Sequence, residues 1–163
     1  IRKGKVPLAE LRGYGNANDA FHQTASSPEG IGAMNAMQQA LQTAGIAPSA
    51  VDYINAHGTA TENNDLSEGI GIQKLFGEHV PYFSSTKPYT GHTLAAAGSI
   101  EAVYSMMALQ HQMVWPNLNY VHQMPELRIS PARDLVQDIP LKNILSNSFG
   151  FGGNTSSLLI GSV

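Results

Sequence analysis

Two histidines follow predicted strands, where chemistry is often placed. His57 lies in NAHGTAT, directly after a strand-like run at 51–56, and His92 lies in YTGHTLAAAG, shortly after a strand-like run at 80–85. Open α/β sheets bind ligands in the loops at the carboxyl ends of their strands. A single histidine there is most often only a packed or surface residue, but two in matched positions indicate a shared site. The other histidines lack this context and receive no role: His22, His79, His111 and His122.

A lone charge within an apolar segment is the second informative feature. Glu101 is the only charged residue from Leu94 to Leu109. An unpaired carboxylate buried there would cost several kcal/mol. Lys87 precedes this segment and is near enough in sequence to fold back over its start, so we predict a Lys87–Glu101 ion pair. Such a pair can be purely architectural or can support catalysis, and burial alone does not separate the two.

A glycine-rich turn, SFGFGG at 148–153, is the third candidate. Its backbone N–H groups could face an oxyanion, although many such turns are only tight hairpins. The turn has neither the Lys-Ser/Thr of a Walker loop nor the GxGxxG spacing of a dinucleotide site, and the chain has no GxSxG nucleophile elbow. No HExxH motif occurs, and neither His57 nor His92 has a close acidic companion in sequence, so no metal site is expected.

Hydrophobic periodicity predicts the elements that position these residues. Strands are predicted at 6–14, 51–56, 80–85, 143–148 and 155–163, and helices at 27–45, 64–76 and 94–111. The helix at 94–111 is apolar almost all round, which predicts burial on every side. Pro88 disfavours a helical conformation for Lys87, which we expect at a strand end or in a loop. The alternation of strands and helices predicts one α/β domain over residues 1–163, with a mostly parallel sheet and helices on its faces.

Composition narrows the class of protein. The chain has 163 residues, 42% of them hydrophobic, which suits one sizeable core. A net charge of −3 argues against a nucleic-acid surface. Charged residues make up only 13%, so part of the surface is expected to face another chain or another half of the same protein. The chain has no cysteine, no signal-peptide pattern and no apolar stretch long enough for a membrane span. We expect a cytoplasmic protein, and the start at Ile1 suggests a fragment or a processed chain.

Three motifs together resemble one enzyme family, the β-ketoacyl-[acyl-carrier-protein] synthases of the thiolase superfamily. They are HGTAT at 57–61 with Asp65 and Glu68, SSTKPYTGH at 84–92 with Glu101, and NSFGFGG at 147–153. Any one could arise by chance, but all three occur in the family's order and spacing. The similarity covers nearly the whole chain and is closest to the bacterial elongating enzymes.

The resemblance implies a thiolase-like fold of two similar halves, each a mixed five-stranded sheet with helices on its faces. This chain matches only the C-terminal half, and the family's nucleophilic cysteine lies in the other half. The implied reaction is decarboxylative Claisen condensation of acyl and malonyl thioesters, in fatty acid or related polyketide biosynthesis, with this chain inactive alone. The implied partners are acyl carrier protein and the N-terminal half, in a homodimer when intact. No cofactor is implied beyond the phosphopantetheine of the carrier protein.

Carried over by position, the resemblance gives roles to the site residues. His57 and His92 would hydrogen-bond to the malonyl thioester carbonyl and stabilise the enolate left by carbon dioxide. Both rings would stay neutral, helped by nearby helix N-termini, and Lys87 with Glu101 would order the cluster. Phe151 would gate the acyl pocket, its N–H completing an oxyanion hole. The remaining positions are Thr59 and Thr61 for the phosphopantetheine arm, with Asp65 and Glu68 in support.

Two other functions remain open. A non-catalytic subunit like the chain-length factors of polyketide synthases usually loses catalytic residues, and the retention of His57, His92 and Lys87 argues against it. A thiolase acting on coenzyme A esters would carry a second cysteine in its C-terminal half, and this sequence contains none.

Overall fold

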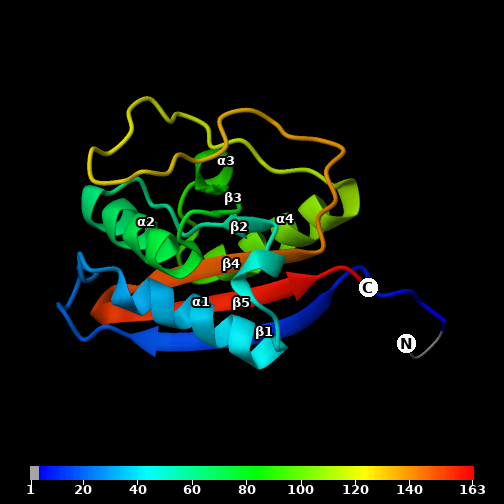
Figure 1. The fold of residues 1–163 in the computed structure, drawn as a ribbon, viewed down its shortest axis with the longest axis horizontal. Helices are drawn as coiled ribbons and strands as arrows, with labels where there is room; N and C mark the ends of the chain where they lie inside the picture. The colour runs from blue at the N-terminus through cyan, green and yellow to red at the C-terminus, as the bar shows by residue number, and fades with distance from the viewer. Residues whose placement is uncertain (1–3) are drawn as a thin grey trace.

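One five-stranded sheet organises the chain. A computed structural model describes residues 4–163. The expectation of a fragment or processed chain was based on Ile1, which lies outside the described residues. The strands are β1 (Glu10–Asn18), β2 (Tyr53–Asn55), β3 (Tyr82–Ser84), β4 (Asn143–Gly150) and β5 (Asn154–Gly161). Their order is β1-β5-β4-β2-β3 (Figure 1). Strand β2 pairs in parallel with β3 and β4, whereas β5 pairs antiparallel with β4 and β1. The sheet is therefore mixed, as the resemblance implies, and not mostly parallel.

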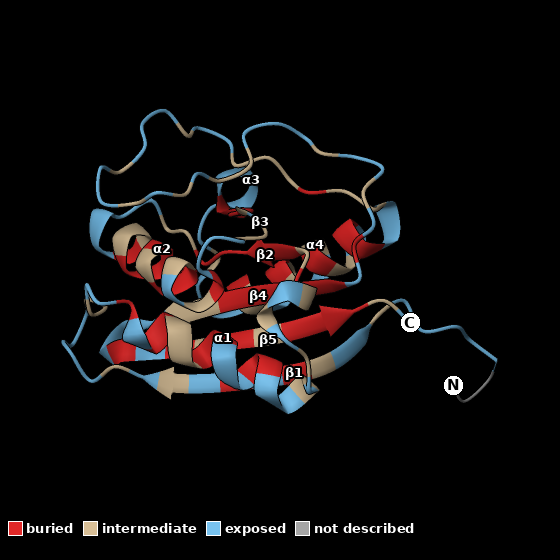
Figure 2. Cartoon of the chain, viewed as in Figure 1, coloured by how far each residue is buried: buried red, intermediate tan, exposed pale blue. Residues whose placement is uncertain are grey.

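Helices cover both faces of this sheet. They are α1 (Ile31–Ala44), α2 (Glu62–Phe76), the single-turn α3 (Lys87–Thr90) and α4 (Ala97–His111), with short 3₁₀ turns at Pro48–Ala50, Leu94–Ala96 and Phe151–Gly153. Successive strand residues point to opposite faces: Ile54 packs with α1 and α2, while Tyr53 packs with α4. The inner strands β2, β4 and β5 are largely buried, and β1 is an exposed edge (Figure 2). No helix in residues 4–163 has the length and apolar character to cross a membrane.

Some predicted boundaries are wrong for identifiable reasons. Helix α1 begins at Ile31, after Gly30 in the left-handed region (φ 65°), and not at Ser27-Pro28. Strand β1 lies four residues later than the predicted 6–14. Its two buried positions are Gly13 and Gly15, which lie against α1 and have no side chain, so no alternating hydrophobic pattern marks the strand in the sequence.

The prediction that the helix at 94–111 is buried on every side is also wrong. Residues 94–96 form a separate 3₁₀ turn, and α4 leaves Val103 49% and Met107 37% exposed. These two side chains are four residues apart and therefore share one side of the helix. No element within residues 4–163 covers the apolar side chains on this face. An exposed apolar face agrees with the low proportion of charged residues in the chain.

The irregular segment 112–142 crosses the top of the molecule as drawn, over α2 and α3 (Figure 1). Within it, Val114 and Val136 form an isolated β-bridge. The N–H of Ala132 donates to the carbonyl of Phe83, which covers part of the free edge of β3. This segment therefore closes the side of the sheet next to the predicted site.

Close contact between β1 and α1 requires glycine at position 15. A Cβ atom there would lie 2.1 Å from the carbonyl oxygen of Ala36. We expect Gly15→Ala to destabilise the fold by about 2 kcal/mol or more, because backbone atoms must separate to admit the methyl group. Urea unfolding measures this. Gly150→Ala is the control, since no atom lies within 4 Å of its added Cβ; equal stability losses in the two variants would contradict the packing described.

Candidate active site

The carboxyl ends of the three parallel strands bring the predicted chemistry together. His57 follows β2, His92 follows β3 by way of α3, and Phe149 lies near the end of β4. The ring centroids of His57 and His92 are 5.4 Å apart, with the rings nearly perpendicular, and Phe149 lies 5.3 Å from His57. Both imidazoles line an open pocket of about 730 Å³, whose walls include Thr59 and the turn at Phe151. The prediction of a common cavity is confirmed.

A buried ion pair stands behind the first imidazole. Lys87 is 7% exposed and Glu101 2%, and the Lys87 ammonium donates to the Glu101 carboxylate, which confirms the predicted pair. The same Nζ lies 3.2 Å from Nδ1 of His57. An ammonium can only donate hydrogen bonds, so Nδ1 of His57 accepts, and the proton of the neutral ring is on Nε2.

Lys87 is the first residue of α3, so the expectation of a strand end or loop is wrong. Pro88 occupies the first turn of that helix, where the missing N–H costs no helical hydrogen bond. Proline restricts the backbone of the residue before it, but a residue at the start of a helix can still precede proline, as Lys87 does here. From this single turn the Lys87 side chain reaches the loop after β2 and α4.

The second imidazole is fixed by the backbone. The N–H of Leu94 donates to Nδ1 of His92 over 3.1 Å. Leu94 adopts a positive φ of 54°, uncommon for a residue with a side chain, within the turn that leads to α4. Since Nδ1 of His92 is an acceptor, its neutral ring also carries the proton on Nε2. The two rings are thus held in the same tautomer by different donors.

Burial keeps His57 neutral. The pKa of His57 is lowered from 6.5 to about 3, first by burial, then by the positive charge of Lys87 and by electrostatic interaction with His92. A contribution from helix N-termini stays a prediction. Burial raises the pKa of Glu101, and the hydrogen bond from Lys87 opposes that rise. A second donor, Ser148 Oγ, lies 3.3 Å from the other oxygen of Glu101. This contact could not be predicted from the sequence, because Ser148 belongs to the glycine-rich motif and not to the helix that carries Glu101.

Two acidic residues of α2 hold the loop that carries His57. Glu68 is buried and accepts the N–H groups of His57 and Gly58, each over 2.9 Å, and the side-chain amide of Asn147 over 3.0 Å. Asp65 accepts the N–H of Ala60 over 3.2 Å. Burial raises the pKa of both carboxyl groups. The two residues therefore support the site through its backbone and do not face the pocket of the two imidazoles.

The pocket mouth holds the remaining predicted residues. The hydroxyls of Thr59 and Thr61 are 3.0 Å apart and line the pocket. Phe151 is 77% exposed on its turn, whose Gly152 donates to the carbonyl of Gln23 over 2.7 Å. The loop around Gln23 forms another wall, at residues 24–26. Sequence reasoning missed this wall, because a polar loop without a motif carries no signal of its position.

Loss of the buried cation should be costly. We expect Lys87→Met to destabilise the protein by about 3–5 kcal/mol, because Glu101 is left as an unpaired buried charge. The double variant Lys87→Met/Glu101→Gln removes that charge and should recover more than half of the loss. Urea unfolding of the two variants and of Glu101→Gln provides the comparison, and a double variant no more stable than Lys87→Met would contradict the pairing.

The pKa of His57 has a defined consequence for pH dependence. Its ring takes up a proton near pH 6.5 when unfolded but only near pH 3 when folded. Its contribution to stability is therefore complete above about pH 6.5 and is lost as the pH falls from there towards 3. In an NMR titration, the His57 ring should show no protonation step between pH 8 and about 5. Lys87→Met should raise this pKa while leaving it below 6.5, since burial is the larger cause; an ordinary His57 titration in the unchanged protein would refute the assignment.

Comparisons with known proteins agree with this geometry. Residues 8–121 match the family model described as "Beta-ketoacyl synthase, C-terminal domain". The 3-oxoacyl-[acyl-carrier-protein] synthase 2 of Staphylococcus aureus is 43% identical over 159 residues, which cover 96% of this chain and 38% of the relative. The mitochondrial synthase of Arabidopsis thaliana is 40% identical over 168 residues, covering 99% of this chain and 36% of the relative.

A solved structure shows the same fold. It is described as a type II PKS acyl-carrier protein in complex with its ketosynthase bound to the hexaketide, and it superposes with a TM-score of 0.94 at 34% identity. The match covers 99% of this chain and 40% of the other. This chain thus spans about two fifths of the length of the proteins it matches. It belongs to the β-ketoacyl synthase family and corresponds to the family's C-terminal domain.

Proposed function

We propose that this chain is the malonyl-decarboxylating part of a 3-oxoacyl-[acyl-carrier-protein] synthase. One observation carries the proposal: the imidazoles of His57 and His92 lie 5.4 Å apart, each with Nδ1 already occupied by a donor. Each neutral ring therefore has one N–H group left to offer. Two such donors beside one pocket suit a single oxygen atom that gains negative charge during a reaction.

In the proposed reaction, that oxygen is the thioester carbonyl of a malonyl group. As the bond to the malonyl carboxylate breaks, carbon dioxide leaves and the electron pair enters the enolate, whose oxygen accepts both Nε2–H groups. The enolate carbon then attacks an acyl thioester, forms the new carbon–carbon bond and expels the thiolate. His57 and His92 remain hydrogen-bond donors throughout, because the enolate needs stabilisation and not a proton.

Lys87 sets the state of His57 for this role. Its ammonium occupies Nδ1 and lowers the pKa of the ring, so His57 stays a neutral donor. Glu101 neutralises the ammonium, so the site does not bury a net positive charge from this pair. We propose that Lys87 and Glu101 act as positioning residues, and that of these four side chains only the two histidines contact the malonyl group.

The acyl-enzyme must form on another part of the protein, because this chain has no cysteine. We propose that an N-terminal half, like the remaining three fifths of the matched relatives, supplies the thiol. The exposed apolar side chains Val103 and Met107 of α4 would pack against it. Acyl carrier protein would present its phosphopantetheine past Thr59 and Thr61, and the turn at Phe151 would gate the acyl side. By the same kinship, we propose a cytoplasmic homodimer that needs no further cofactor.

A chain-length-factor role is less favoured. A subunit without catalysis has no need of a buried amine held against an imidazole, and the Lys87–His57 contact survives here at 3.2 Å.

The proposal predicts loss of decarboxylation on removal of one donor. In a protein that includes the cysteine-bearing half, His92→Ala should slow carbon dioxide release from malonyl-acyl carrier protein by about 100-fold or more. His79→Ala, at an exposed histidine outside the site, should leave the rate unchanged. The 163-residue chain alone should give no condensation product. Comparable release by His92→Ala, or condensation by the chain alone, would contradict the proposed roles.

A further inference from the structure

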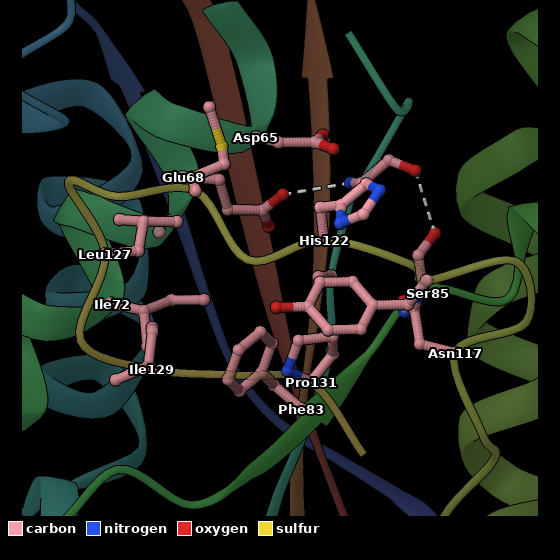
Figure 3. Close-up of a pocket in the computed structure, with 15 residues that line it drawn as sticks. Asp65, Glu68, Ile72, Phe83, Ser85, Asn117, His122, Leu127, Ile129 and Pro131 are labelled. Atoms are coloured by element: carbon pink, nitrogen blue, oxygen red, sulfur yellow. Dashed lines mark hydrogen bonds between the residues drawn. The ribbon is translucent and has the colours of Figure 1, made fainter. Parts of the chain in front are cut away.

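A second cavity lies behind the loop that carries His57. It has a volume of about 160 Å³ and lies between α2 and the irregular segment 117–131 (Figure 3). Ala56 and Gly58 line it, whereas the His57 side chain between them lines the pocket of the two imidazoles. At this point the two spaces lie on opposite sides of the backbone of residues 56–58. We call this second space the side cavity.

The side cavity is apolar over most of its wall. The apolar side chains around it are those of Ile72, Phe83, Met124, Leu127, Ile129 and Pro131. An engineered protein cavity of about 150 Å³ with Leu, Ile and Phe walls stays free of water and binds benzene. A cavity of this size and lining therefore suits one aromatic ring or a short branched aliphatic group.

A carboxyl group marks one side of this apolar space. Oδ1 of Asp65 accepts hydrogen bonds from the N–H of Ala60 and the side-chain amide of Asn64. Oδ2 receives none from residues 4–163, and Asp65 lines the side cavity near Glu68 and His122 (Figure 3). No buried polar side-chain atom of residues 4–163 lacks a partner, so solvent reaches Oδ2, and a ligand with one hydroxyl or amine donor would take the place of water there.

The backbone between the side cavity and the active site is held by hydrogen bonds. Glu68 holds the N–H groups of both His57 and Gly58. Gly58 has a positive φ of 40°, and a Cβ atom there would lie 2.6 Å from Cβ of Ser85. Because one carboxylate holds both N–H groups, a ligand that displaces Gly58 would also disturb the hydrogen bond that fixes the backbone of His57.

From this arrangement we propose that the side cavity binds a small aromatic or branched aliphatic molecule with one hydrogen-bond donor, and that its occupancy is transmitted to His57. The binding does not depend on the proposed function. Only the consequence for catalysis rests on it, since that requires His57 to act on the substrate.

Phenol and toluene are matched probes of the site, because they have nearly the same shape and only phenol has a donor. In NMR titrations of the ¹⁵N-labelled 163-residue chain without substrate, phenol should shift the amides of Gly58 and Gly69 saturably and move the His57 ring resonances. Toluene should bind about five-fold more weakly, for want of one hydrogen bond.

Variants that fill the side cavity provide the control. Leu127→Trp should reduce phenol binding at least ten-fold, whereas Leu135→Trp, at an exposed position of the same irregular segment, should not change it. Thermal unfolding identifies any variant that fails to fold, and Ile129→Phe then replaces Leu127→Trp.

Three outcomes overturn the inference. The binding site is wrong if phenol gives no saturable shift at the cavity residues, or if it binds equally well to the filled variants. The transmission is wrong if phenol binds and the His57 ring resonances stay in place. None of these outcomes bears on carbon dioxide release, so the failure of this inference and that of the proposed function are distinguishable.

Discussion

The site depends on the two contacts of the buried Lys87 ammonium, with Glu101 and with His57. This ammonium joins three parts of the chain: α3, which carries it, α4, which supplies Glu101, and the loop after β2, which carries His57. A buried ammonium in this position is stable only while the carboxylate faces it. The protonation state of the His57 imidazole therefore depends on the packing of α4, which carries that carboxylate. Ser148, near the end of β4, ties that strand to the same carboxylate.

The two imidazoles reach the same tautomer by unlike means. His57 is buried and set by a charged side chain, whereas His92 is exposed and set by the N–H of Leu94. One ring is therefore sensitive to the electrostatics behind the site and the other to the conformation of the turn before α4. The buried side of the pocket is thus held by charge, and its open side by a backbone hydrogen bond.

Much of this site could be predicted from the sequence, because its reactive residues lie in short motifs that follow predicted strands. Histidines after two strands predicted a shared pocket, and a lone glutamate in an apolar helix predicted its pairing with Lys87. Packing across the fold was not predictable in the same way. The apolar residues of α4 around Val103 predicted a buried face, because apolar character does not show whether a face is covered within the same domain. The side cavity around Leu127 was not predictable, because one of its walls is an irregular segment without hydrophobic periodicity. Pro88 misled because the rule for its predecessor is weaker at a helix start.

The tautomeric state of the two rings is the decisive property of this site. Two-bond ¹H–¹⁵N spectra of the histidine side chains at neutral pH distinguish a protonated ring nitrogen from a free one. We expect His57 and His92 both to be neutral, each with its proton on Nε2 and an unprotonated Nδ1 that accepts a hydrogen bond. An imidazolium at His57, or a proton on Nδ1 of either ring, would contradict this expectation, because the site would then lack its pair of matched donors.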